Sequence, residues 1–377
     1  MSESRRPPRL GIDYWPATTH APGVGRYVRE LVRALVRLET PPHLRLFDVG
    51  PGPRTLPEAA LGLETDARIR RLRLSLPRRV LTACSWALDA RRMLGGVELF
   101  HRVFPAQPPV RGGSQVLALS EVPRHRSAAE ESLLTCLEDS RGAGGASRIG
   151  DVIVMSRHAR DLAREQLGLE ADRIHLVPVG CDHWVRDVPP LAQPPGPPTL
   201  LVLGATDRRR RHAAILAAFN LLRARDMEAR LVFSGRRGDA AGEVAAAISS
   251  SPWRHEITWH DAPREADMPG RVAEAAVLIH LSDDEHTPVT PLEACAAGVA
   301  VVASALPAFG EALGNEAALL PCEAPPEAIA EALTGALASA QDPAARARRI
   351  QLASAYTWEQ CARATQTVWK RILARGS

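Results

Sequence analysis

AVLIHLSDDEHTPVTPLEACAAGVAVVAS, residues 276–304, is the stretch that decides the fold class. It begins with an apolar run at 276–281, continues through a polar loop, and ends with a second apolar run at 299–304. Between them, residues 291–298 are mostly small or apolar and are typical of a short helix. Two buried strands joined by a helix form a parallel βαβ unit. The stretch therefore predicts an α/β protein with a parallel sheet.

The same alternation of strand and helix continues on both sides of this stretch. In the first half we predict strands at 9–15, 44–49, 98–104, 115–120, 151–156 and 174–179, with helices at 26–39 and 157–169. In the second half we predict further strands at 200–204, 229–235 and 256–260, with helices at 211–225, 242–250 and 267–275. A last helix at 355–374 carries an apolar stripe that must be packed.

The two halves are separated by residues 186–199, a segment with six prolines that cannot form regular structure. We therefore predict two Rossmann-like, doubly wound domains, at 1–185 and 200–352, joined by a linker at 186–199. In open α/β sheets, ligands bind beyond the carboxyl ends of the strands. A cleft between the two sheets is accordingly the predicted binding site.

Composition narrows the class of protein. The 377 residues exceed what one hydrophobic core usually serves, and 45% of them are hydrophobic. The net charge is only +4 and aromatic residues make up 4%, which disfavours a nucleic-acid partner. Six cysteines without a CxxC pair argue against a disulfide framework and a zinc site. No apolar run suits a signal peptide or a membrane span, so we expect a cytoplasmic protein.

Two glutamates flank the start of the helix in the quoted stretch. Glu285 follows the first strand directly, and Glu293 lies eight residues later. Thr290, followed by a proline and then by Glu293, also matches a capping box, which is an equally good structural interpretation. In the functional interpretation, the helix N-terminus holds a phosphate and the carboxylates bind hydroxyl groups on either side of it. A nucleotide sugar has that layout of ribose, diphosphate and sugar ring.

Four arginines at 208–211 follow the strand at 200–204 and open the next helix. A solvated basic turn is the commoner explanation of such a run. At the carboxyl edge of the sheet, the arginines would instead give a diphosphate charge-assisted, bidentate hydrogen bonds. Gly23 and Gly25, between a strand and a helix, let the backbone approach a ligand closely. Val28 stands where a dinucleotide-binding loop needs its third glycine, which disfavours a nicotinamide enzyme.

Several segments, in one shared order, resemble glycosyltransferase family 4, whose members are retaining enzymes with the GT-B fold. GIDYW and GVGRYVRELVRAL are similar to the opening strand, glycine loop and first helix of that family. DVIVMSRHARDLAREQLGLEADRIHLVPVGCD is similar to its next conserved segment, and EHTPVTPLE is similar to its pair of glutamates separated by seven residues. ACAAGVAVVAS is similar to the segment after those glutamates, and YTWEQCARATQTVWKRIL to the terminal helix of the family. The resemblance covers almost the whole chain.

The resemblance implies a role for each matching residue. Glu285 would bind hydroxyls of the donor sugar and Glu293 the ribose. Arg209 and Arg210 would hold the diphosphate, and Gly23 and Gly25 would shape a loop that closes over both substrates. The helix at 353–375 would cross back to the first domain.

The implied reaction transfers a sugar from a nucleotide sugar to a glycan, a lipid-linked saccharide or a small glycoside, with retention at the anomeric carbon. The departing phosphate would accept the proton of the acceptor. The reaction would need neither a side-chain nucleophile nor a metal or other cofactor. Arg210 and Glu285 are the residues expected to carry catalysis.

The chain departs from the family pattern near both substrates. Ser120 and Glu121 stand where the family commonly has His-Asp near the acceptor, and His101 also ends a strand on the acceptor side, although a structural histidine is an equal alternative. His286, Thr287 and a proline replace Gly-Phe-Gly after the first glutamate. We count Ser120 and His101 as acceptor-binding residues.

On the donor side, we add His286, Thr287 and Thr290 to the binding residues, and His286 would replace a lost backbone donor. The departures leave an alternative function, namely a divergent glycosyltransferase-like subunit that binds or scaffolds with weak or no catalysis. A sugar-nucleotide epimerase of the same fold is a third option. The arginine-rich segment at 68–79 is either a solvated stretch or a peripheral contact with the inner membrane face.

Overall fold

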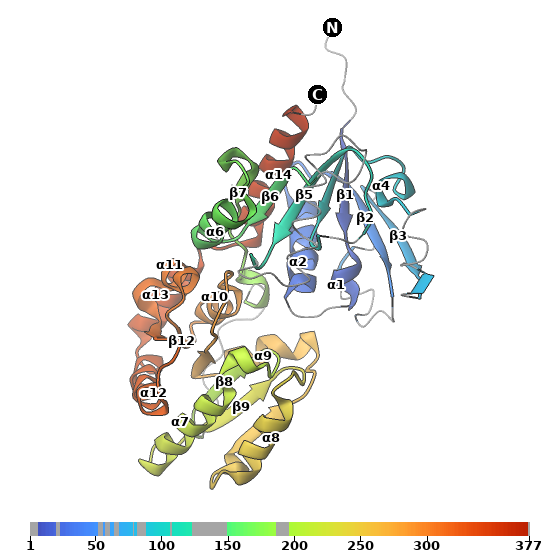
Figure 1. Cartoon of the computed structure of the whole chain (residues 1–377). Helices are drawn as coiled ribbons and strands as arrows, with labels where there is room; N and C mark the ends of the chain where they lie inside the picture. Colours follow the sequence, from blue (N-terminus) through green and yellow to red (C-terminus); the bar gives the residue numbers. More distant parts are fainter. Residues whose placement is uncertain are drawn as a thin grey trace. The chain divides into compact units, whose positions relative to one another are not determined.

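The computed structural model describes residues 7–19, 23–51, 56, 61–63, 68–77, 79–80, 88–105, 108–122, 149–185 and 196–375. The chain divides into two compact units (Figure 1). The first unit comprises Met1–Val179 and Trp358–Ser377, and the second is Gly180–Thr357. Of the predicted linker, 186–195 lie outside the described residues.

The first unit is built on a parallel sheet of seven strands in the order β3-β2-β1-β4-β5-β6-β7. In its centre, Ile12 lies between Leu46 and His101 on the two adjoining strands. The strands are β1 (Arg9–Asp13), β2 (His43–Gly50), β3 (Ile69–Ser75), β4 (Leu99–Arg102), β5 (Ser114–Leu119), β6 (Asp151–Val154) and β7 (Ile174–Leu176). The helices are α1 (Trp15–Thr19), α2 (Val24–Arg37), α4 (Ala90–Met93), α6 (Arg157–Leu167) and α14 (Trp358–Arg375).

Six of these seven strands occur where the sequence predicted them. The exception is β3, which lies at the edge of the sheet and falls in the arginine-rich segment. Its residues Arg70, Arg73 and Leu74 are exposed. Charged side chains are typical of edge strands because they discourage pairing with another chain. The same charged residues interrupt the alternation of apolar and polar residues by which a half-buried strand is recognised in a sequence.

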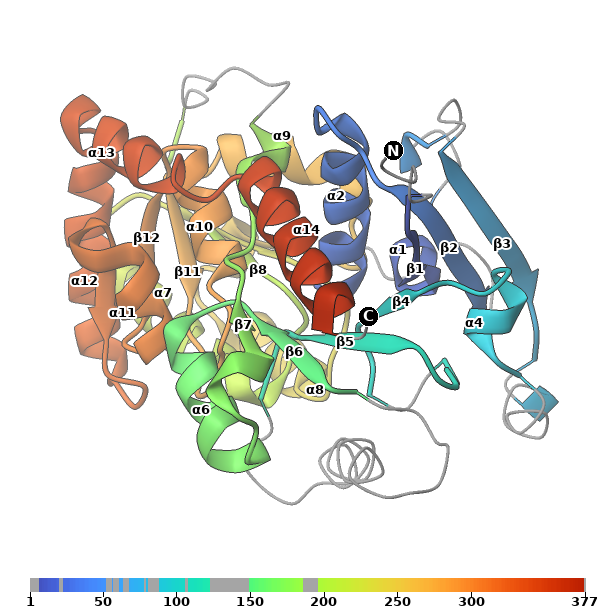
Figure 2. The same cartoon turned by 90° about the horizontal axis from the view of Figure 1, so that it is seen from above.

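The last helix, α14, packs against α2 within the first unit (Figure 2). Its predicted stripe is buried, from Trp358 through Trp369 to Ile372. Trp369 donates a hydrogen bond from Nε1 to Nδ1 of His101, at 3.2 Å. Burial of two tryptophans contributes a large apolar area. The C-terminal helix is therefore part of the first unit, although it follows the second in sequence.

The second unit has a parallel sheet of six strands in the order β10-β9-β8-β11-β12-β13. The strands are β8 (Thr199–Leu203), β9 (Arg230–Ser234), β10 (Ile257–His260), β11 (Val277–His280), β12 (Ala300–Ser304) and β13 (Ala318–Leu320). The helices are α7 (His212–Ala224), α8 (Ala241–Ser250), α9 (Met268–Ala273), α10 (Val289–Ala296), α11 (Pro307–Leu313), α12 (Pro326–Ala340) and α13 (Pro343–Ala353).

Both faces of this second sheet are covered by helices. Successive side chains of β11 point to opposite faces, so Val277 and Ile279 join the core that includes α7, α8 and α12. Leu278 joins the other core, with Phe309 and residues of α9, α10 and α13. A strand buried on both faces reads as a continuous apolar run, which is the signal quoted at 276–281. The predicted α/β class with doubly wound parallel sheets is confirmed.

Candidate functional site

The candidate site forms where β8 and β11 end side by side in the second sheet. The two strands are parallel neighbours, with Ile279 opposite Val202, so their carboxyl ends meet at one edge. The loops after these strands are joined by hydrogen bonds. The amide of Asp283 donates to the carbonyl of Arg209 at 3.0 Å, and Nη1 of Arg209 donates to the carbonyl of Asp284 at 2.9 Å.

The four consecutive arginines do not act as one basic patch. Arg208–Arg210 form a single 3-10 turn, and Arg211 has a positive φ of 53° just before α7. Arg208 pairs with exposed Glu243, and Arg211 donates to backbone carbonyls of the segment before α12. Only Arg209 and Arg210 are directed towards the loop after β11. The turn therefore directs two of the four arginines to the candidate site and the other two to contacts elsewhere.

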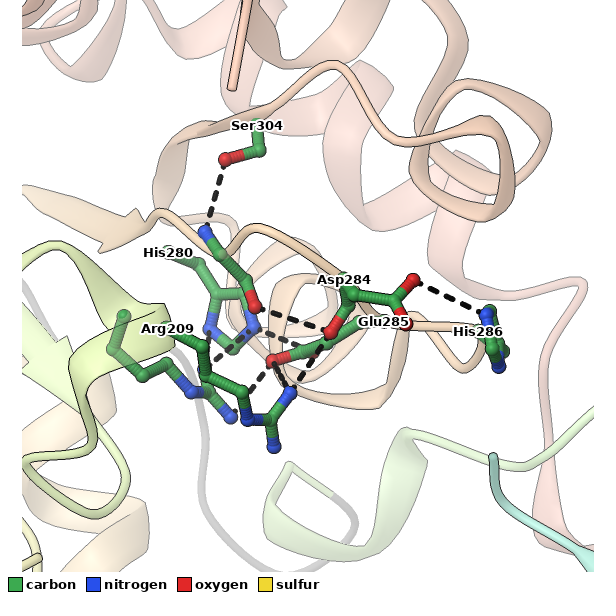
Figure 3. Close-up of polar contacts among 8 residues, drawn as sticks. Arg209, His280, Asp284, Glu285, His286 and Ser304 are labelled. Carbon is green, nitrogen blue, oxygen red and sulfur yellow. Dashed lines mark hydrogen bonds and ion pairs between the residues drawn. The ribbon is translucent and has the colours of Figure 1, made fainter. Parts of the chain in front are cut away.

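Glu285 is the centre of this candidate site (Figure 3). Its Oε1 lies 2.9 Å from Nη2 of Arg210 and 3.4 Å from Nη1 of Arg209. Its Oε2 lies 2.9 Å from Nε2 of His280. Although burial raises the pKa of Glu285, its contacts with His280 and the two arginines outweigh this effect and lower the pKa to about 2. Glu285 is therefore an ionised carboxylate that is only 8% exposed.

His280 is a member of this cluster that the sequence analysis missed. It is the last residue of β11, is 2% exposed, and packs against the ring of Phe309 with centroids 5.5 Å apart. Burial lowers the pKa of His280, and so do Arg210 and Arg209, against the opposing effect of Glu285. The available signal was a polar side chain inside an apolar run, since a buried polar group needs a partner.

The helix after Glu285 corrects the capping-box interpretation, which is wrong. Helix α10 begins at Val289 with Pro288 at the N-cap, and no side chain caps it. The amide of Leu292 donates to the carbonyl of Pro288 at 3.1 Å, so the first turn has already closed there. Thr290 thus lies inside the helix, where its backbone is no longer in the extended conformation that a capping residue needs. Because Pro291 has no N–H, Val289 and Thr290 carry the amide donors of this first turn.

Glu293 lies in α10, and its side chain is fully buried. Its Oε1 is 3.3 Å from Nε2 of His183, which lies in the short 3-10 turn Asp182–Trp184. His183 was not singled out from the sequence. The second glutamate therefore faces a ring nitrogen of His183.

Polar contacts also hold the loop that runs from Ser282 past Glu285 to Thr287. Nε2 of His286 lies 3.2 Å from Oδ1 of Asp284, and His286 is 2% exposed (Figure 3). The hydroxyl of Ser282 donates to the carbonyl of Asp284, and its amide donates to the hydroxyl of Ser304. Thr287 is half-buried. The ring of His286 is thus directed at the loop itself, which weighs against its predicted role as a substitute backbone donor.

The predicted acceptor and loop residues lie in the first unit. Gly23 is the N-cap of α2, with φ 62° and ψ −125°, and Gly25 lies within the first turn of that helix. Ser120 follows β5 directly and is half-buried.

His101 is completely buried, and its two ring nitrogens lie 3.4 Å from the hydroxyl of Tyr27 and 3.2 Å from Nε1 of Trp369. Burial lowers the pKa of His101 to about 3. Both nitrogens are thus occupied inside the core. The geometry supports the alternative of a structural histidine and corrects its assignment to the acceptor site.

Comparison with known proteins bears on the same part of the chain. Residues 186–353 match the family model of glycosyl transferases group 1. The matched segment covers most of the second unit and contains Arg209, Arg210, Glu285 and Glu293. No curated protein matches the sequence significantly.

Solved structures match both units. Sucrose-phosphate synthase from Thermosynechococcus elongatus has a TM-score of 0.72 and 19% identity, covering 98% of this chain and 100% of that one. A glycosyltransferase from Rickettsia africae has a TM-score of 0.71 and 13% identity over 98% and 99% of the two chains. Anabaena Alr3699/HepE, solved with UDP and glucose, has a TM-score of 0.70 and 11% identity over 97% and 100%. At these identities the likeness shows the fold, which is GT-B.

Among the described residues, no group of three histidine, cysteine, aspartate or glutamate side chains is placed to hold a metal ion. None of the described helices combines the length and the apolar character needed to cross a membrane.

Proposed function

We propose that this protein is a retaining glycosyltransferase of family 4 that moves a hexosyl group from a nucleotide sugar to a saccharide or lipid-linked acceptor. One observation carries the proposal. Two arginine side chains and a buried, ionised glutamate meet at the carboxyl edge of a parallel sheet, inside a domain that matches glycosyl transferases group 1. Ligands of open α/β sheets bind at this edge.

The proposed chemistry uses the arginines to stabilise the leaving group. As the bond between the anomeric carbon and the phosphate oxygen breaks, negative charge accumulates on the nucleoside diphosphate. Arg209 and Arg210 would neutralise that charge with preorganised donors. The acceptor oxygen bonds to the anomeric carbon from the same face, and its proton passes to the departing phosphate oxygen. The guanidinium groups supply the positive charge, so we propose a metal-independent reaction.

The two glutamates and the first unit would position the substrates. Glu285 would accept hydrogen bonds from hydroxyls of the donor sugar, and Glu293 from those of the ribose. Thr287 and Thr290 lie between these glutamates and are proposed to contact the donor. Gly23 and Gly25 would shape the loop over the substrates, and Ser120 would face the acceptor. The structure of Anabaena Alr3699/HepE was solved with UDP and glucose, which makes UDP-glucose the first donor to try.

A thermal-shift screen with UDP, GDP and ADP tests the proposal. A ligand at about a hundred times its dissociation constant stabilises the native state by about 2.7 kcal/mol, which raises the melting temperature measurably. The nucleotide that stabilises the protein then selects the sugar nucleotides for a transfer assay. Stabilisation by none of the three, together with no transfer or hydrolysis, would remove the proposal.

A second candidate is a divergent subunit that binds without turnover. The observation in its favour is Pro288, which stands at the N-cap of α10 and has no N–H to offer a donor substrate. This candidate is supported if a nucleotide stabilises the protein while no sugar nucleotide is consumed. Interconversion of one sugar nucleotide into another, without an acceptor, would indicate an epimerase.

We propose a cytoplasmic location, with a peripheral contact to the inner membrane face. The exposed arginines and Leu74 of β3, which is 40% exposed, support this contact. Anionic lipid surfaces attract clusters of basic residues near them. Sedimentation with anionic vesicles, compared with neutral vesicles, tests it.

A further inference from the structure

His280 is a buried polar residue at the end of an otherwise apolar strand, and it contacts two residues of the candidate site. Its side chain is 1% exposed, so its ring nitrogens have little access to water and need partners within the protein. Nε2 lies 2.9 Å from Oε2 of Glu285. Nη1 of Arg210 lies 2.8 Å from Nε2 and 3.2 Å from Nδ1. The ring is therefore placed between a carboxylate and a guanidinium.

These partners determine which nitrogen carries the hydrogen. An ionised carboxylate only accepts hydrogen bonds, so Nε2 must carry the hydrogen that reaches Glu285. Nη1 of Arg210 approaches both ring nitrogens at once, so it lies against the ring and not along the lone pair of either nitrogen, and this approach is a packing contact. A neutral ring with its hydrogen on Nε2 satisfies the carboxylate and adds no second positive charge beside Arg210. The lowered pKa of His280 agrees with this neutral form.

The hydrogen bond to Oε2 also limits how Glu285 can hold the arginines. Both arginines contact the same oxygen, Oε1. A carboxylate that is not held elsewhere tends to take an arginine in a bidentate pair through both of its oxygens. In such a pair two nitrogens of Arg210 would be taken up by Glu285, instead of the one that contacts it now. With His280 in place, one carboxylate oxygen is reserved and Arg210 is held through the other.

We propose that His280 is a positioning residue, whose Nε2–H reserves one oxygen of Glu285 and so keeps the guanidinium of Arg210 oriented towards a nucleoside diphosphate. This inference rests on the proposed function. It adds a residue to the donor site that acts through Glu285 and Arg210, and itself needs no contact with substrate.

Two substitutions separate positioning from simple packing. His280→Leu keeps an apolar side chain in the core but removes the hydrogen bond. His280→Gln restores a donor near the position of Nε2. His255→Leu is the matched control. This histidine is exposed and lies before the start of β10, an outer strand of the same sheet, whereas His280 lies at the end of β11. Thermal unfolding of each variant checks that it is folded before its binding is measured.

The measurement is calorimetric titration of the full chain with UDP, GDP and ADP, and with the corresponding nucleosides. For a diphosphate that the wild type binds, we expect the Kd to rise about tenfold in His280→Leu, the effect of one charge-assisted hydrogen bond. His280→Gln should stay within about threefold of the wild type, as one retained hydrogen bond allows. Nucleoside binding should not change. In nitrogen NMR of the wild type, His280 should carry its hydrogen on Nε2.

The outcomes distinguish the two proposals. If the wild type binds none of the three diphosphates, the proposed function fails and the inference fails with it. If the wild type binds one and His280→Leu binds it equally well, only the inference fails. A weak His280→Gln variant, or an Nδ1–H form of the ring in the NMR spectrum, also overturns the positioning role.

Discussion

Replacing Glu285 by glutamine should remove a specific part of the acid sensitivity of the second unit. Glu285 has a folded-state pKa of about 2 against an ordinary value of 4.5. The folded state therefore holds its proton less tightly than the unfolded chain. The stability that this carboxylate contributes is fully present above the ordinary value, and it is lost as pH falls from 4.5 towards 2.

The size of this effect follows from the pKa difference. The full shift is worth about 3 kcal/mol, and about 2 kcal/mol of it is lost between about pH 5 and about pH 3. Glu285 is 8% exposed, so solvent screens this interaction only weakly. Glu285→Gln cannot ionise, so its unfolding free energy should fall with pH by about 2 kcal/mol less than that of the wild type over the same interval.

Urea unfolding at a series of pH values measures the effect. Hydrogen exchange on peptides from β11 and β12 follows the second unit separately, because a two-unit chain need not unfold in one step. Glu243→Gln is the control, since Glu243 pairs with Arg208 in an exposed position where ion pairs contribute little. If Glu285→Gln and the wild type lose stability in parallel, Glu285 is not stabilised as an anion and the described cluster is incorrect.

Three further changes test the donor site and the glycine loop. Arg210→Ala should lower transfer by about a hundredfold or more, the usual effect of losing a preorganised donor, while Arg208→Ala stays near the wild type; equal rates in both would remove the diphosphate role. Glu293→Gln should raise the Kd for the nucleoside diphosphate more clearly than it lowers the melting temperature, and the reverse ranking would leave the residue only a structural role. Gly23→Ala should destabilise the first unit by about 1–3 kcal/mol, because alanine is strained at φ 62°, whereas Gly25→Ala inside α2 should not; comparable melting temperatures would contradict the described loop.

The order of strands and helices was largely predictable, and the failures have local causes. Strands such as β11 and β12 are apolar except for their last residues, and such runs indicate burial on both faces of a sheet. The strand β3 was missed because arginines at a sheet edge resemble a basic loop. The start of α10 was placed two residues late because Thr290 and Pro291 match a capping pattern that the folded chain does not use.

The site was predicted only in part. Arg209, Arg210 and Glu285 follow adjacent strands, and topology places the carboxyl ends of parallel strands together, so the sequence alone brought these three side chains to one edge. Residue spacing alone did not show which arginines face the glutamate, because four identical residues in a row are distinguished only by a turn of the backbone. The family resemblance named Arg209 and Arg210, and these are the two that contact Glu285. The pairs of Glu293 with His183 and of His101 with Trp369 join residues far apart in sequence.

By itself, then, the sequence determined the fold class, the two doubly wound sheets and the edge where an anion would bind, because these depend on the periodicity of apolar residues and on the direction of the strands. Only the tertiary structure decided that His280 holds Glu285, that His101 is a core residue, and that two of the four arginines serve other contacts. A hydrogen bond or an ion pair depends on distances of about 3 Å between atoms, and such distances are set when the elements pack and not by the spacing of residues along the chain.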